Sequence, residues 1–184
     1  MDLDKAIKNR VSVRKFKSKK PDWRDILEAL NVALYAPMAG NIFTVRFVLV
    51  SKQDKIEEIA GACQQQFISQ AQYVVVVCSQ KTKPTISYGD RAEVYIRQQA
   101  GAAIQNFLLK LEEQGLSTCW VGDFYEDKIK RIIRTPEDVQ IEAVFPIGYA
   151  LENPKPKIKL ELQRIMFYDE WGEKRMKPLE KLDV

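Results

Sequence analysis

Apolar residues recur along the chain with two periods, which separate the expected helices from the expected strands. Apolar residues three or four positions apart predict helices at about 2–9, 21–35, 54–66, 91–114 and 126–133. Short runs rich in β-branched and aromatic residues predict strands at 45–50, 73–78, 117–121 and about 142–148. Pro136 separates the last helix from the last strand.

Two of these elements have a distinctive composition. The run from Tyr73 to Cys78 is apolar at every position, as in a central strand that is covered on both faces. The longest helical pattern contains small residues from Ala100 to Ala103, which allow another backbone to approach closely. Gly115 follows this pattern at the position where many helices end.

The segment from Asn153 onward differs from the rest of the chain. Pro154 and Pro156 interrupt regular structure there. The residues beyond them are too apolar to hang free in water, so they need a surface to cover. An arm that wraps a partner subunit and a tail that packs on its own domain both satisfy this need. The apolar residues are Leu160, Leu162, Ile165, Met166, Phe167, Tyr168 and Trp171.

Length and composition are those of an ordinary soluble protein. At 184 residues, with 46% hydrophobic and 29% charged residues, the chain fits a single domain spanning 1–184. No stretch approaches the ~20 apolar residues that cross a bilayer. The first ten residues, MDLDKAIKNR, lack the apolar core of a signal peptide. We therefore expect a cytoplasmic protein without a membrane partner.

Positive charge is concentrated at the head of the chain. The net charge is +4, but residues 1–24 carry nine Lys or Arg against three Asp, and the remainder is slightly negative. Such a head indicates a local anion site or a solvated face. It argues against nucleic acid as a partner, because nucleic-acid binding would need a basic surface of greater extent.

Cysteine and histidine usage narrows the possible chemistry. The chain has no histidine and three cysteines without metal-ligand spacing, which excludes Cys/His zinc sites and histidine-based triads. We expect no metal and no disulfide framework, and we interpret Cys78 and Cys119 as small buried hydrophobic residues. The chemistry must come from carboxylates, hydroxyls, backbone groups or a bound cofactor.

Residues 10–14 form the first candidate motif. In an extended stretch, Arg10, Ser12 and Arg14 point to one side, and Val11 and Val13 to the other. Two guanidinium groups and a hydroxyl on one side suit a phosphate, since arginine makes charge-assisted and often bidentate hydrogen bonds to it. A solvated edge strand with buried valines accounts for this pattern equally well.

The sequence APMAGN, from Ala36 to Asn41, is the second candidate. Proline, glycine and asparagine predict a turn with an unusual backbone path directly after a helix. The Asn41 amide offers both the donor and the acceptor that the edge of a heteroaromatic ring requires. An ordinary helix-ending loop is the alternative.

The sequence GLSTCWVGDF, from Gly115 to Phe124, is the third candidate. If a strand ends at Gly122, the backbone amides of Gly122 and Asp123 face a flat ligand across its end. The alternative is a plain connection between a strand and a helix.

Taken in order, these motifs resemble the nitroreductase family. The resemblance covers about residues 6–171 and includes the helical segment QNFLL at 105–109 and the IGY turn at 147–149. It implies an α+β fold of three α/β/α layers, with a mixed and mainly antiparallel sheet. It also implies an intertwined homodimer with two FMN sites at the interface, in which residues 153–184 form a C-terminal arm around the partner subunit.

The resemblance also implies roles for particular residues. Arg10, Ser12 and Arg14 would hold the FMN phosphate. The 37–41 loop would reach the flavin or ribityl chain from the opposite subunit, and the Gly122 amide would donate a hydrogen bond to flavin N5. The implied cofactor-binding residues are Arg10, Val11, Ser12, Arg14, Pro37, Met38, Ala39, Asn41, Val121, Gly122, Asp123, Lys157 and Lys159.

The sequence departs from the family pattern in three places. Met38 stands where serine or threonine is common, and Phe43-Thr44-Val45 replaces Gln-Pro-Trp. Lys159 replaces an arginine, which keeps the charge but loses the bidentate fork. The first two departures change the wall of the implied pocket and so bear on the substrate range.

By resemblance, the chain is an FMN-dependent oxidoreductase. Electrons would pass from NAD(P)H through FMN to a nitroaromatic, quinone or flavin acceptor by a ping-pong mechanism. A second hypothesis keeps the fold and FMN but performs reductive dehalogenation or flavin fragmentation; longer lids would be expected there than the short stretch at 79–95. A third is a non-enzymatic basic binding module, which would account for the head alone.

Overall fold

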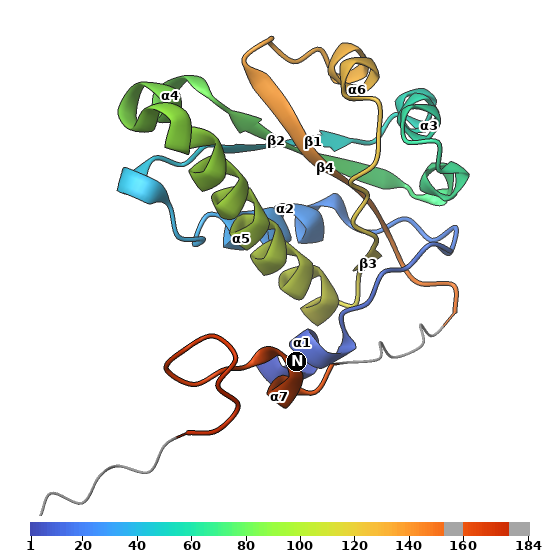
Figure 1. Ribbon diagram of the computed structural model, residues 1–184. Coiled ribbons are helices and arrows are strands. Elements are labelled where there is room, and N and C mark those ends of the chain that lie inside the picture. Colours follow the sequence, from blue (N-terminus) through green and yellow to red (C-terminus); the bar gives the residue numbers. More distant parts are fainter. Residues whose placement is uncertain (153–159, 177–184) are drawn as a thin grey trace, which may run out of the picture.

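An antiparallel sheet of four strands forms the centre of the molecule (Figure 1). The computed structural model describes residues 1–152 and 160–176. Val76 in the second strand of the sheet pairs with Val48 on one side and Val144 on the other. The strands are β1 (Val45–Val50), β2 (Tyr73–Gln80), β4 (Val139–Gly148) and β3 (Ser117–Thr118), in that spatial order. The interior position of β2 and its burial from Tyr73 to Ser79 confirm the prediction from its apolar run.

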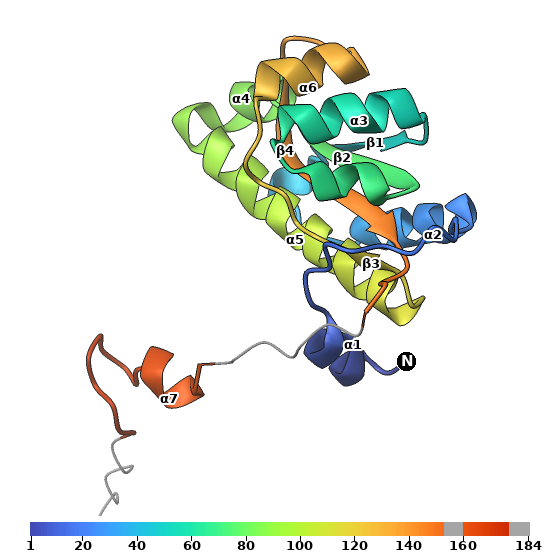
Figure 2. The ribbon, with the colours of Figure 1, turned by 90° about the vertical axis from the view of Figure 1, so that its right-hand side faces the viewer.

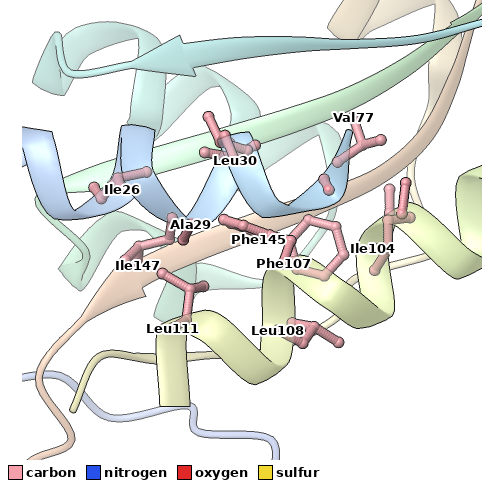
Figure 3. Packing of buried hydrophobic residues seen from close by; sticks show 14 of the residues in the cluster. Ile26, Ala29, Leu30, Val77, Ile104, Phe107, Leu108, Leu111, Phe145 and Ile147 are labelled. Carbon is pink, nitrogen blue, oxygen red and sulfur yellow. The ribbon is translucent and has the colours of Figure 1, made fainter. Parts of the chain in front are cut away.

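Helices cover both faces of the sheet, which gives the expected three layers (Figures 1 and 2). On one face, Phe107 of α5 meets Phe145 of β4 edge to face, with ring centroids 5.8 Å apart (Figure 3). On the other face, Val76 and Val144 share a buried cluster with Ile129. The first face carries α2 (Trp23–Ala33) and α5 (Ala92–Glu113), the second carries α3 (Gln53–Ala62) and α6 (Glu126–Ile133), and α1 (Leu3–Asn9) packs against α5.

Local sequence signals set several helix ends. The carboxylates of Asp2 and Asp22 cap α1 and α2 by accepting hydrogen bonds from the backbone N–H groups of Lys5 and Arg24. Gly115 follows α5 with a φ of 74°, and the N–H of Leu116 donates to the carbonyl of Leu111. The predicted boundaries at 91–114 are therefore correct to one residue at each end.

Apart from the 117–121 strand, two predicted boundaries are wrong by three or more residues, and one helical stretch was not predicted. The helix predicted at 54–66 ends at Ala62, because Gln64 takes a left-handed φ of 53° and breaks the helical path. The last strand begins at Val139, three residues before the predicted start. The stretch at 79–95 contains α4 (Thr82–Tyr88) and a short 3-10 helix, η3 (Gly89–Arg91), which no prediction included.

The strand predicted at 117–121 is interrupted by its partner. Ser117 and Thr118 pair with Gly148 and Ile147, and Val121 forms an isolated bridge with Val144 in the same register. That register places Cys119 opposite Pro146, which has no N–H to donate to the ladder. The extended path therefore continues to Val121, although regular pairing stops at Thr118.

Residues 160–176 lie outside the helical layers. Figure 2 shows α7 (Leu162–Ile165) away from the sheet and from α1. Leu162 and Ile165 are 63% and 62% exposed, and Trp171 is 92% exposed. Packing of this segment on its own domain is thus not what the structure shows, and Leu162, Ile165 and Trp171 have little cover within the described part of the chain.

Candidate functional site

The Arg10–Arg14 segment lies along the outer edge of the sheet. Ser12 forms a parallel bridge with Thr118, and the N–H of Val13 donates to the Thr118 carbonyl at 2.9 Å. Val13 is buried against Phe16 and Ala71, with Val11 packed beside them. The predicted alternation of the valines and polar residues is confirmed.

The polar side chains of this segment are free to bind a ligand. Within residues 1–152 and 160–176, the side chains of Arg10, Ser12 and Arg14 make no hydrogen bond or ion pair. The Arg14 guanidinium lies 6.0 Å from the Phe67 ring centroid. Burial raises the pKa of the nearby Glu112 carboxyl, while the positive charge of Arg10 opposes that shift. The edge therefore presents two guanidinium groups and a hydroxyl that no described carboxylate neutralises directly.

The 37–41 loop has the unusual backbone path that its composition predicts. Gly40 and Asn41 have φ values of 54° and 58°, inside the short 3-10 helix η1 (Ala39–Asn41). Tyr88 of α4 covers Gly40 so closely that a Cβ there would collide with its hydroxyl. Pro37 and Asn41 are exposed, and Met38 and Ala39 are half-buried. Tyr88 of α4 thus packs directly on this loop.

One residue that the sequence reasoning missed, Gln99, anchors the end of this loop. Its Oε1 accepts from the N–H and the hydroxyl of Thr44, at 2.7 and 2.6 Å, and its Nε2 donates to the carbonyl of Ile42 at 3.0 Å. Both Gln99 and Thr44 are buried. Thr44 lies in the Phe43-Thr44-Val45 segment that departs from the family pattern, so this departure coincides with a local anchor.

The strand leading to Gly122 forms the third part of the candidate site. Val121 and Val144 exchange two backbone hydrogen bonds of 3.0 Å, and Val121 is buried. Gly122 and Asp123 follow it and are exposed. A Cβ added at Gly122 would meet only the Trp120 indole, at 3.8 Å. The surface at Gly122 is therefore open to a flat ligand.

The structure brings two of the three motifs together in one chain. The bridge between Ser12 and Thr118 places the Arg10–Arg14 segment beside the strand that ends at Gly122. The 37–41 loop precedes β1, at the opposite edge of the sheet, three strand spacings or ~14 Å from β3. Lys157 and Lys159, predicted to close on a phosphate, lie outside the described residues.

The cysteines are poor candidates for chemistry. Cys63, Cys78 and Cys119 are all buried and free. Burial raises the pKa of Cys63 to about 12, with Asp123 contributing, and the pKa of Cys78 to about 12, with Glu142 contributing. Neither thiol forms a thiolate near neutral pH. In the described part of the chain, no group of three or more acidic or cysteine side chains could hold a metal ion.

A separate cavity lies away from the candidate site. It has a volume of about 230 Å³, lies between α1, α2 and α5, is lined by residues such as Leu3, Val32 and Leu109, and includes none of the predicted site residues. Among the described helices, none is long and apolar enough to span a membrane.

Comparison with known proteins identifies the family. The model of the nitroreductase family matches residues 7–70 and 60–149. The chain belongs to the nitroreductase family. Iodotyrosine deiodinase of Thermotoga neapolitana is 28% identical, over 82% of this chain and 89% of that protein. A putative NADH dehydrogenase/NAD(P)H nitroreductase of Methanothermobacter thermautotrophicus is also 28% identical, over 90% of this chain and 86% of that protein.

Solved structures of other proteins in the family have the same fold as this chain. An oxidized iodotyrosine deiodinase bound to FMN and 3-iodo-L-tyrosine is 25% identical, with a TM-score of 0.76 over 87% of this chain and 95% of that one. An NADPH:FMN oxidoreductase of Vibrio harveyi complexed with NAD⁺ is 19% identical, with a TM-score of 0.83 over 93% of this chain and 78% of that one. The protein is an oxidoreductase of this family.

Proposed function

We propose that this protein is an FMN-dependent oxidoreductase that takes electrons from NAD(P)H and passes them to a small acceptor, such as a nitroaromatic compound, a quinone or a free flavin. The observation that carries the proposal is the pairing of Ser12 with Thr118. It aligns the cationic Arg10–Arg14 segment with the strand that ends at Gly122, so one edge of the sheet offers a phosphate site and an open backbone amide.

The residues on this edge fit FMN. Arg10, Ser12 and Arg14 lack described protein partners and can bind its phosphate, which carries about −1.5 to −2 charges. Thr118 and Gly122 are four residues apart in an extended path, or ~13 Å, which is comparable with the span from the phosphate to flavin N5 in extended FMN. Lys157 and Lys159 would add positive charge at the phosphate end.

When bound, FMN supplies the hydride and electron transfer. The protein's contribution is binding and orientation. The Gly122 amide would donate a hydrogen bond to flavin N5, with Val121 holding the strand in place and Asp123 beside it. Because the chain has no histidine, and Cys63 and Cys78 keep their protons at neutral pH, we propose water as the proton source for the acceptor.

The complete site would need two copies of the chain. In one chain the 37–41 loop lies at the opposite sheet edge from Gly122, so the partner's copy of this loop would supply Pro37, Met38, Ala39 and Asn41. The exposed apolar residues at 160–176 would cover the partner subunit as an arm of a single-domain protein. We propose a homodimer on these grounds; a cytoplasmic location stays a prediction of the sequence.

Reductive dehalogenation of an aromatic compound is the second candidate function. The similarity to iodotyrosine deiodinases, at 28% and 25% identity, favours it over other flavin chemistry. The stretch at 79–95, shorter than the lids expected for such chemistry, contains the seven-residue helix α4 between β2 and α5.

The visible absorption spectrum of the purified protein, with added FMN and then NADH or NADPH, tests the proposal. We expect a bound oxidised flavin that bleaches with the nicotinamide and regains its colour with a nitroaromatic or quinone acceptor. Release of iodide from 3-iodotyrosine by the reduced protein, without turnover of those acceptors, would favour the second function. Failure to bind FMN after reconstitution would refute both.

A matched pair of variants tests the phosphate site. Arg14→Gln should weaken FMN binding about tenfold or more, since a charge-assisted hydrogen bond is lost. Arg24→Gln removes the same charge from an exposed residue that pairs with Asp22, and should leave binding unchanged. If both variants lose the same FMN affinity, only the overall positive charge of residues 1–24 contributes to binding.

A further inference from the structure

Trp120 occupies the middle of the sheet edge between the two ends of the proposed site. It is 44% exposed, although its sequence neighbours Cys119 and Val121 are buried. Its ring stands edge to face on Phe145 at 5.5 Å, and Phe145 meets Phe107 in the core in the same manner. The exposed indole is therefore held from below by an aromatic stack and has little freedom to turn away.

The strand register fixes the direction in which Trp120 points. Alternate residues of an extended strand share a face, so Thr118, Trp120 and Gly122 lie on one side, and Val121 points into the opposite cluster. The indole Nε1 is 3.8 Å from the position of a Cβ at Gly122. Among the described residues, no acceptor hydrogen-bonds this N–H. A large aromatic face and a free donor thus border the amide end of the edge.

We infer that Trp120 is a flavin-positioning residue, whose indole contacts the FMN ring system between the phosphate end at Ser12 and the amide at Gly122. The inference rests on the proposed function, because it assumes that FMN lies along this edge. Aromatic surface fixed in advance by Phe145 suits a planar heterocycle, since stacking on it adds affinity without ordering a flexible side chain.

Binding of FMN and riboflavin to the same variants tests this contact. Riboflavin has the ring system but no phosphate, so a lost ring contact weakens both ligands by one factor. We expect Trp120→Ala to weaken both by about tenfold to a hundredfold. Arg14→Gln should weaken FMN alone. A loss in Trp120→Ala that is confined to FMN, or that stays below twofold for both ligands, would overturn the inference.

The emission of the bound flavin provides a second measurement, which does not depend on activity. An indole in van der Waals contact quenches flavin emission by electron transfer. Trp120→Phe preserves an aromatic ring on Phe145, so it should fold, and bound FMN should then emit several-fold more strongly. Trp23→Phe is the control, because Trp23 is similarly exposed at 47% but lies on α2.

These measurements distinguish the role of Trp120 from the proposed function. Unchanged emission in Trp120→Phe, with FMN bound normally, overturns the role of Trp120 and leaves the proposed function standing. Absence of FMN binding by the unaltered protein overturns the proposed function and this inference with it.

Discussion

At the scale of single residues, Gln99 shows how one buried amide anchors the end of the candidate 37–41 loop. Its three hydrogen bonds satisfy Thr44 and the Ile42 carbonyl where the loop enters β1. Gln99→Leu has a similar volume but leaves these buried groups without partners. We expect the free energy of unfolding, measured by urea denaturation, to fall by about 3 kcal/mol.

The adjacent residue provides the control for this substitution. Gln98 lies on the same helix and is exposed, so Gln98→Leu should change stability by less than about 0.5 kcal/mol. Similar losses in the two variants would mean that the hydrogen bonds of Gln99 contribute little.

Gly40 permits a second test at this scale. Gly40→Ala must keep a left-handed φ of 54° and also displace the Tyr88 hydroxyl. Gly115→Ala has a positive φ of 74° but meets no atom within 4 Å. In urea denaturation, we expect Gly115→Ala to cost ~1 kcal/mol and Gly40→Ala to cost clearly more. Adding Tyr88→Phe to Gly40→Ala should recover the difference; no recovery would show that the backbone alone sets the cost.

At the scale of elements, a β-bulge buries a carboxyl group between β4 and α5. The register shifts between Val77 and Cys78, which leaves Glu142 as the extra residue of β4. Its side chain is 6% exposed and lies 3.4 Å from the Arg97 guanidinium. Burial raises the pKa of the Glu142 carboxyl, while Ser79, Arg97 and Lys81 lower it and Glu126 adds to the rise.

This bulge predicts a pH dependence of stability. Because the folded pKa lies above the ordinary value of 4.5, folding favours the protonated form, and stability is lost as pH rises through the folded pKa. Glu142→Gln cannot ionise, so its unfolding free energy relative to the unaltered protein should rise from pH 4 to pH 7. Glu93→Gln, which removes an exposed partner of Arg97, should show no such rise. A decrease with pH for Glu142→Gln would show that the Arg97 pair outweighs burial.

Only some of the helices and strands could be predicted from the sequence pattern. Strong patterns, such as the buried β2 run and the apolar face of α5, gave the correct elements. One error arose where a distant residue decides local structure, since Pro146 interrupts the pairing of the 117–121 strand. Likewise Gln99 was overlooked, because its role depends on Thr44, which is 55 residues away in the chain.

At the scale of the whole molecule, the sheet order explains why the candidate site is only partly assembled in one chain. The motifs at 10–14 and 118–123 share an edge, whereas the 37–41 loop lies beyond β1 at the other edge. The linear sequence shows all three motifs but not their separation, since the order of strands depends on the fold. The twofold assembly that we propose would place the partner's copy of this loop near Gly122.

The segment 160–176 gives the test of that assembly. Leu162 and Ile165 on α7 are mostly exposed, and burying each against a partner would contribute about 1.5–3 kcal/mol, twice over in a symmetric dimer. By light scattering, we expect the protein to have about twice the chain mass of 21.3 kDa. Leu162→Asp with Ile165→Asp should shift it to the monomer and weaken FMN binding together, because the site would lose the partner's loop. Gln163→Asp, between them on the same helix, should do neither. A monomeric parent protein that binds FMN tightly would show that one chain completes the site.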